Sequence, residues 1–171
     1  MPERYRETYE RLLMYATRYN LSIENRLGYG IQGIVYSSTI RTAIKCHKRE
    51  QAYAIERDVY LRLQRKRVKS VCGFAVPTYV RSDDELLAVE MRVVNPPYVL
   101  DFAGAYIDKP LPYDAEQLQE WEESKREQFG DRWPMVKLVM HGFKKFGIAL
   151  SDLKPGNIEF ASDSGGSSLP D

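Results

Sequence analysis

The stretch from Arg26 to His47 has the sequence RLGYGIQGIVYSSTIRTAIKCH, and it decides the fold of this chain. Three glycines, Gly28, Gly30 and Gly33, are followed by a β-branched run and then by a lysine among apolar residues. Glycine has no Cβ, so its backbone can come close to phosphate oxygens. Because the residues after Gly33 favour a strand, the stretch predicts either a loop that covers phosphates or a hairpin without a ligand.

The lysine of this stretch, Lys45, is expected to have a partner. It shares one face of the predicted strand 41–47 with Ala43, since alternate side chains of a strand point the same way. Helical periodicity returns over residues 50–63 and places Glu56 on or beside the apolar stripe. An unpaired charge at such a position is costly. We therefore expect Glu56 to pair with Lys45, the alternative being a lysine that points to water.

A third segment with chemical potential is SDLKPGN, residues 151–157, between two short apolar runs that favour strands. Asp152 has a carboxylate that can accept a proton from a hydroxyl, and Lys154 has an ammonium that can steady a transferring phosphate. The side-chain oxygen of Asn157 can bind magnesium. Taken alone, the segment is equally typical of a solvent-exposed turn, because a Pro-Gly pair favours turns.

The remaining patterns predict helices at both ends of a β-rich region. Helical spacing of apolar residues runs over 3–19, and Asp114 with Gln117 three residues later has the pattern of a capping box that opens a helix ending near Phe129. Residues 95–113 contain four prolines and are expected to form an irregular connector. A last helix is predicted over 134–146, and further strands over 34–40, 71–80 and 85–94.

Composition argues against two classes of partner. The 25 basic and 24 acidic residues leave a net charge of +1, so nucleic acid is not expected as a partner. No apolar run approaches the ~18 residues that a membrane span needs, and the charged start MPERYRETYERLL is no signal peptide. Cys46 and Cys72 lie among apolar residues and indicate packed, reduced thiols, so a cytoplasmic location is expected. The basic run is interpreted as the solvated end of a helix, and it comprises Arg62, Arg65, Lys66, Arg67 and Lys69.

In this order, the segments resemble the protein kinase-like superfamily, of which the chain would be a truncated, minimal member. Gly28 to Val35 matches the glycine-loop pattern with its valine, Ala43-Ile-Lys45 matches the lysine strand, and Glu56 matches the glutamate of the αC helix. LLAVEMRV, residues 86–93, is similar to the strand that enters the hinge, with Val89 as gatekeeper. DLKPGN, residues 152–157, is similar to the catalytic loop.

The resemblance implies an α+β, two-lobed fold with a small antiparallel sheet, an αC-like helix and a shortened helical C-lobe. The implied domains are an N-terminal helix (1–20), an N-lobe (21–94) and a truncated C-lobe with a polar tail (95–171). The implied cofactors are ATP and magnesium. Asp152 would orient the acceptor hydroxyl, Lys154 would neutralise developing charge, and Asn157 would hold magnesium. The implied nucleotide-binding residues are Gly28, Gly30, Gly33, Val35, Ala43, Lys45, Glu56, Glu90 and Arg92.

Two departures from the family pattern leave the activity open. Leu150 and Ser151 stand where the family has His-Arg, and no Asp-Phe-Gly triplet or activation segment occurs. Asp171, 14 residues after Asn157, is the candidate metal carboxylate, the alternative being a frayed end. The predicted function is therefore ATP binding, with phosphoryl transfer to a hydroxyl acceptor such as a small molecule. The alternative is a pseudokinase that binds nucleotide or a protein partner without catalysis, and a third hypothesis is an adaptor that uses the basic run.

Overall fold

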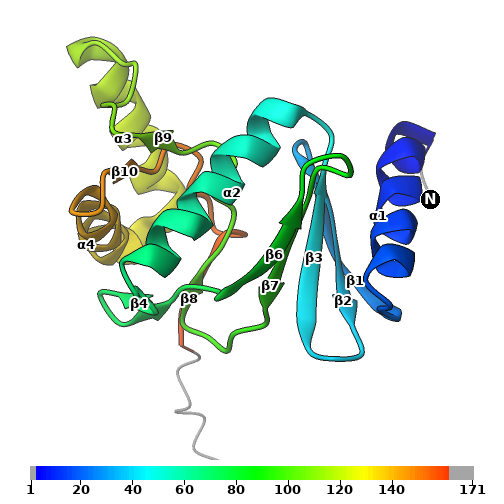
Figure 1. The fold of residues 1–171 in the computed structure, drawn as a ribbon. Helices are drawn as coiled ribbons and strands as arrows, with labels where there is room; N and C mark the ends of the chain where they lie inside the picture. Colours follow the sequence, from blue (N-terminus) through cyan, green and yellow to red (C-terminus); the bar gives the residue numbers. More distant parts are fainter. Residues whose placement is uncertain (1–2, 162–171) are drawn as a thin grey trace, which may run out of the picture.

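The computed structural model describes residues 3–161 of the chain, and its largest element is an antiparallel sheet of five strands in the order β1-β2-β3-β7-β6 (Figure 1). The α1 helix (Arg6–Arg18), which follows a 3-10 turn (η1, Glu3–Tyr5), covers one face of this sheet. The α2 helix (Glu50–Arg65) covers the other. The strands are β1 (Ile23–Gly30), β2 (Gly33–Ser38), β3 (Thr42–His47), β6 (Tyr79–Asp83) and β7 (Ala88–Arg92).

The central strand β3 is buried along its whole length because a helix packs on each of its faces. Ile44 and Cys46 point into an apolar cluster beneath α1, where Leu12 and Tyr15 are fully buried. Ala43 faces the other side and belongs to the main core, to which α2 contributes Tyr53, Val59, Tyr60 and Leu63. The predicted helices over 3–19 and 50–63 are thus confirmed, and each is held by its apolar stripe.

The single strand predicted over residues 71–80 is wrong. The chain forms two short strands, β4 (Ser70–Val71) and β5 (Phe74–Ala75), around a turn in which Cys72 and Gly73 have φ angles of 50° and 84°. Gly73 adopts this conformation without a Cβ penalty, so the run breaks there. Cys72 is consequently exposed, and only Cys46 is the packed thiol that we expected.

The connector 95–113 is more ordered than its four prolines suggested. It contains β8 (Tyr98–Val99), which pairs with β5 and with β11 (Ile158–Glu159). It also contains β9 (Tyr106–Ile107), which pairs with β10 (Ile148–Ala149). Because β10 and β11 flank the loop 151–157, the connector lies directly against that loop.

Two helices precede this loop. The α3 helix (Ala115–Phe129) begins with the predicted capping box, in which the Gln117 amide donates to Asp114 Oδ1 at 2.9 Å and the Asp114 amide to Gln117 Oε1 at 3.0 Å. After a 3-10 turn (η2, Gly130–Arg132), the α4 helix (Trp133–Lys144) buries an apolar face in the main core. Among residues 3–161, no helix combines the length and the apolar character needed to cross a membrane.

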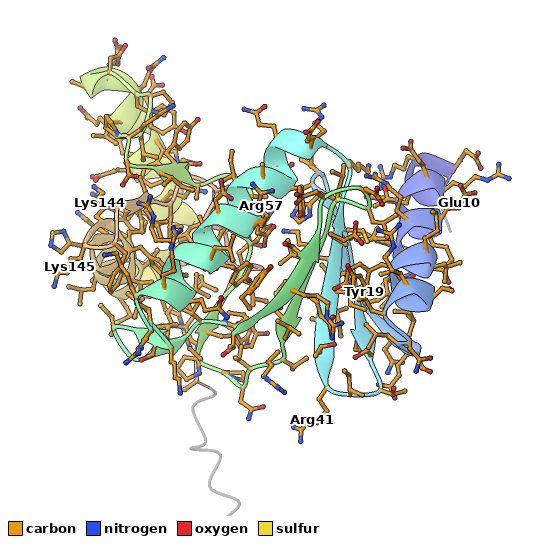
Figure 2. The ribbon with its side chains drawn as sticks, in the orientation of Figure 1. Glu10, Tyr19, Arg41, Arg57, Lys144 and Lys145 are labelled. Atoms are coloured by element: carbon orange, nitrogen blue, oxygen red, sulfur yellow. The ribbon has the colours of Figure 1, made fainter. Side chains whose placement is uncertain are left out.

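The basic run at the end of α2 is solvated only in part. Arg65, Lys66, Arg67 and Lys69 are exposed, as predicted. Arg62, in contrast, holds Asp108 through two contacts of 2.5 and 2.6 Å and also donates to the Phe146 carbonyl oxygen. It therefore ties α2 to the segments around β9 and β10. Figure 2 shows Lys144 and Lys145 directed outward at the end of α4.

Candidate functional site

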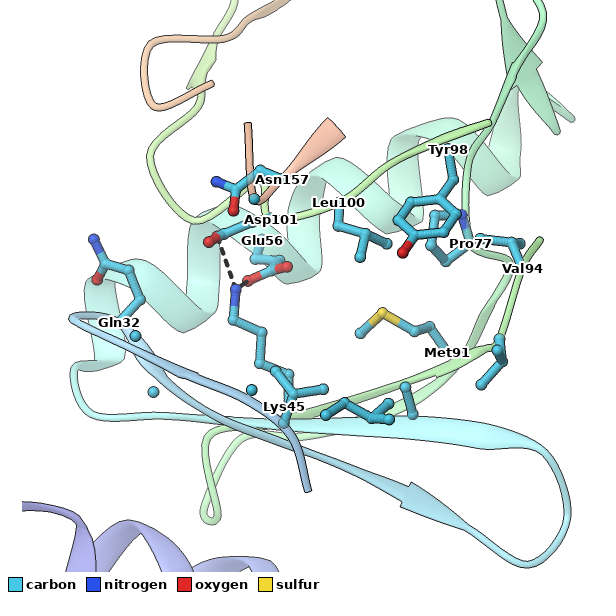
Figure 3. Close-up of a pocket in the computed structure, with 18 of the residues that line it drawn as sticks. Gln32, Lys45, Glu56, Pro77, Met91, Val94, Tyr98, Leu100, Asp101 and Asn157 are labelled. Carbon is cyan, nitrogen blue, oxygen red and sulfur yellow. Dashed lines mark hydrogen bonds and ion pairs between the residues drawn. The ribbon is translucent and has the colours of Figure 1, made fainter. Parts of the chain in front are cut away.

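Most of the predicted site residues meet around a cavity of about 430 Å³ on the α2 side of the sheet (Figure 3). Its walls come from several segments of the chain. They include the glycine hairpin 27–33 with Val35, the pair Lys45 and Glu56, the end of β7 with residues 92–94, and the segments 98–101 and 154–157. Pockets that hold small molecules have this size and this mixture of apolar walls and a few charged groups.

The three glycines of the hairpin have different reasons to be glycine. A Cβ on Gly33 would collide with the carbonyl oxygen of Cys46, so β2 can pack on β3 only with glycine there. A Cβ on Gly28 would meet nothing within 4 Å, and one on Gly30 would only reach the Gln32 amide at 4.0 Å. Packing within the chain therefore explains Gly33, whereas it does not explain Gly28 and Gly30, which line the cavity.

The pairing of Lys45 with Glu56 is confirmed. Lys45 Nζ lies 2.6 Å from Glu56 Oε2 and 2.8 Å from Asp101 Oδ1, and the Lys45 and Glu56 side chains are 7% and 1% exposed. Burial alone would lower the pKa of Lys45, but attraction to Glu56 and Asp101 outweighs it and raises the pKa. Burial would likewise raise the pKa of Glu56, but Lys45 and His47 lower it to about 2. Both partners are therefore charged at neutral pH.

Asp101 is the site residue that the sequence interpretation missed. It follows β8 with φ of +66°, and its side chain is 23% exposed at the cavity wall. The preceding Leu100 amide donates to the Asn157 carbonyl oxygen at 2.7 Å, which joins the Asp101 segment to the loop 151–157. Asp101 begins the segment Asp101-Phe102-Ala103-Gly104, which stands before the loop 151–157 in the chain. Asp171, the metal carboxylate predicted instead, lies outside the described residues.

The loop 151–157 brings two of its three predicted residues to the cavity. Lys154 and Asn157 line it, and the Asn157 side-chain amide donates to the Asp152 carbonyl oxygen at 3.1 Å. Asp152 is half-buried and does not line the cavity. It lies close to Gly104, because a Cβ built on Gly104 would come within 2.9 Å of the Asp152 Cβ. Asp152 therefore packs against the segment that carries Asp101.

The α3 helix supports the backbone of this loop. Trp121 Nε1 donates to the Ser151 carbonyl oxygen at 3.2 Å, and the buried Lys125 ammonium donates to that of Leu153. Burial lowers the pKa of Lys125. Ser151 Oγ donates to the Gly104 carbonyl oxygen at 2.5 Å.

The hinge edge of the cavity lies further along the chain than the sequence predicted. Met91, Arg92, Val93 and Val94 line it, so Arg92 is at the cavity as expected. Glu90 is not among the lining residues: its fully buried carboxylate accepts from Tyr15 and Thr42 at 3.0 and 2.7 Å and pairs with Arg81 at 2.9 Å. This correction follows from the strand period, because Glu90 points to the α1 face while Met91 points to the cavity face. Val89, our expected gatekeeper, packs in the main core, and Met91 stands at the cavity in its place.

A sheet of this strand order, a helix glutamate on the β3 lysine and a facing Asp-Leu-Lys-Pro-Gly-Asn loop occur together here. The chain has a protein kinase-like fold. No protein-family model matches the sequence, and no curated protein matches it.

Similar solved structures include aminoglycoside phosphotransferases. The streptomycin–ATP complex of APH(2")-IIa has 15% identity and a TM-score of 0.38, over 72% of this chain and 37% of that one. The ADP-bound APH(2'')-Ib has 17% identity and a TM-score of 0.39, over 72% and 35%. The GDP and kanamycin complex of APH(2")-IIia has 22% identity and a TM-score of 0.38, over 78% and 45%. The chain spans less than half the length of each of these proteins.

Proposed function

We propose that this chain binds magnesium–ATP in the cavity and transfers its γ-phosphoryl group to a hydroxyl acceptor. One observation carries the proposal. A buried, charged lysine is held between Glu56 and Asp101 at 2.6 and 2.8 Å, and it faces a cavity that is lined by a glycine hairpin and by Asn157. An ammonium that is held in place and faces glycine backbone is suited to bind the α- and β-phosphates of a nucleotide.

The apolar part of the cavity suits the adenine ring. Leu27, Val35, Ala43, Met91 and Leu100 contribute side chains to the lining, so a flat base would be enclosed by apolar surface. At the edge of the cavity that residues 91–94 form, the Arg92 and Val93 amides donate to the carbonyl oxygens of Thr78 and Arg41. Among residues 3–161, the Val94 amide has no backbone hydrogen-bond partner, so it is available to bind the base.

The residues at the polar end fit a magnesium ion. Asp101 supplies a carboxylate, and Asn157, whose Nδ2 is occupied by the Asp152 carbonyl oxygen, has its amide oxygen left to coordinate. Magnesium prefers hard oxygen ligands and takes the rest from phosphates and water. When bound, it would neutralise charge on the β- and γ-phosphates. We assign this ligand set to Asp101 and Asn157 in place of Asp171.

In the transfer step, the bond between the γ-phosphorus and the β-phosphate oxygen breaks and a bond from the acceptor oxygen to the γ-phosphorus forms. Asp152 would orient the acceptor hydroxyl and accept its proton, and Lys154 would neutralise charge on the transferring group. The non-catalytic alternative has one observation in its favour, since Asp152 does not line the cavity in this structure. Turnover therefore has to be measured separately from binding.

The test is calorimetric titration and thermal unfolding with magnesium–ATP, on the wild type, Lys45→Ala and the control Lys144→Ala. ATP at 100 times its Kd should stabilise by ~2.7 kcal/mol. For a domain of this size that raises Tm by roughly 5–10 °C. Lys45→Ala should lose most of the shift, and Lys144→Ala, an exposed lysine at the end of α4, should keep it. Absence of binding in the wild type would remove the proposal, and binding without phosphate release would favour the pseudokinase.

A further inference from the structure

A histidine that the proposed phosphate site does not use lies directly behind it. His47 stands two residues after Lys45 at the end of β3 and is fully buried. Its Nε2 lies 2.6 Å from Glu56 Oε2, the same oxygen that Lys45 Nζ contacts at 2.6 Å. His47 does not line the cavity. Glu56 is therefore held by a cation at the cavity wall and by an imidazole from the interior.

The two contacts of the imidazole determine where its protons are. Nδ1 lies 3.1 Å from the Leu87 carbonyl oxygen, which can only accept, so Nδ1 carries a hydrogen. In a neutral ring Nε2 would then present a lone pair to a carboxylate oxygen only 2.6 Å away. That approach is favourable only if a proton lies between the two atoms. The same Glu56 oxygen already pairs with the Lys45 ammonium at 2.6 Å, which favours its carboxylate form, so the proton belongs to His47.

We propose that His47 is an imidazolium and a positioning residue for Lys45, acting through Glu56. Its first effect is geometric, because a donor on the interior side fixes the carboxylate that in turn fixes the lysine. Its second effect is electrostatic. Lys45, Glu56 and Asp101 alone carry one net negative charge, and the His47 charge makes the four-residue cluster neutral. A neutral cluster repels an incoming polyphosphate less than an anionic one.

Among the described residues, no other side chain offers the His47 imidazole an acidic hydrogen-bond partner. From α2, Tyr53 meets the imidazole edge-on with ring centroids 5.8 Å apart, and its hydroxyl donates to Asp84 at 2.5 Å instead of to the histidine. From β2, Gly33 pairs opposite His47 and brings no side chain. Between residues 3 and 161, Glu56 is the only acidic side chain in hydrogen-bond contact with His47.

The protonation state is tested directly by ¹⁵N NMR of the ring nitrogens at neutral pH. The chain has only two histidines, and His141 is exposed, so His141→Gln leaves a single imidazole signal set. We expect both nitrogens of His47 to have protonated, imidazolium-type shifts. A ring with one pyridine-type nitrogen would overturn the proposal, and this measurement does not require any change at His47.

The positioning role rests on the proposed function and is tested with two near-isosteres. His47→Gln keeps a donor near the Nε2 position, whereas His47→Asn keeps one only near the Nδ1 position. In His47→Asn we expect the Kd of ATP to rise by about tenfold, a change of ~1.4 kcal/mol, with a smaller rise in His47→Gln. The affinity for adenosine, which has no phosphates for Lys45 to bind, should stay unchanged in both variants.

Two results would contradict the positioning role. One is an unchanged ATP affinity in His47→Asn. The other is an equal loss of ATP and adenosine affinity, which is what a merely structural histidine would produce. If the wild type binds neither ligand, the proposed function fails, and the NMR measurement still decides whether His47 is an imidazolium.

Discussion

At the scale of single residues, the site depends on a carboxylate that is buried because it has two cationic partners. Glu56 is 1% exposed, and its Oε2 is shared by Lys45 and His47. An isolated carboxylate in such surroundings would be neutralised, but here the pKa is lowered to about 2. The sequence predicted the first partner from helix periodicity. It could not predict the second, because His47 shows only strand alternation and its contact with Glu56 arises when α2 packs on β3.

Glu56→Gln should therefore lower the free energy of unfolding by about 3 kcal/mol at pH 7, because it leaves two buried cations with one partner fewer. The sign of the pH dependence follows from the lowered pKa. The carboxylate stabilises the fold above pH 4.5, its ordinary pKa, and this stabilisation is lost as the pH falls toward 2. Urea unfolding of both proteins between pH 7 and pH 2 should show the difference shrinking in that window. A constant difference would mean that Glu56 is not ionised in the fold.

The coupling of Glu56 with Lys45 can be measured separately by a double-mutant cycle. Lys45→Met and Glu56→Gln each leave the other charge buried, so the double variant should be less destabilised than the sum of the two singles, by about 1–3 kcal/mol. Chemical unfolding of the four proteins at pH 7 gives this interaction energy. Lys144→Met serves as the matched control, since an exposed lysine at the end of α4 should show additive effects with Glu56→Gln.

At the scale of elements, the glycines in the hairpin of β1 and β2 have two different roles, one in packing against β3 and one in lining the cavity. Gly30 pairs with Gly33 at its tip, and the next strand, β3, lies beside Gly33, which pairs with His47. Only Gly33 faces backbone atoms that a Cβ would strike. The glycine pattern was visible in the sequence, but the different reasons for each glycine depend on the pairing of three strands.

Alanine substitutions in this hairpin should consequently split into two classes. Gly33→Ala should destabilise by about 1–3 kcal/mol or more, because the backbone of β3 would have to move. Gly28→Ala should change the free energy of unfolding by no more than about 0.5 kcal/mol, because a Cβ there meets nothing, yet weaken the binding of ATP, because Gly28 lines the cavity. Denaturation curves together with ATP titrations distinguish the two. Equal stability of the two variants would contradict the assignment.

The α3 helix offers a second test at this scale, because it holds the backbone of the loop 151–157 from outside. Trp121→Phe keeps an aromatic ring but removes the donor to the Ser151 carbonyl oxygen. Amide hydrogen exchange in the loop should become faster, and turnover, where present, should fall more than ATP affinity. Glu127→Gln on the exposed surface of the same helix should change neither quantity. Unchanged exchange in Trp121→Phe would show that α3 does not position the loop.

At the scale of the whole molecule, the sequence predicted the parts of the site that have a local pattern. It did not predict Asp101, which reaches the site from a different place along the chain. The glycine hairpin, the lysine strand, the αC-like helix and the loop 151–157 each keep their pattern within a short segment. Asp101 does not, because it reaches the cavity through the pairing of β8 with β11 and β5, which depends on strands of two residues each. Glu90 was misplaced for a different reason, since strand alternation points it to the α1 face, where its partners lie on α1, β3 and β6.

Two carboxylates are candidates for the magnesium ion of the proposed function. Asp101 lies before the loop 151–157 and faces the cavity beside Asn157, whereas Asp171 is the carboxylate that the family order would favour. We expect Asp101→Asn to abolish the dependence of ATP affinity on magnesium and any turnover, while ATP without metal still binds through Lys45. Asp171→Asn, the matched control, should leave both unchanged. Titrations of ATP with magnesium and with chelator, and line broadening by manganese, measure the effect. If Asp171→Asn removes the metal dependence and Asp101→Asn does not, Asp101 serves only to hold Lys45.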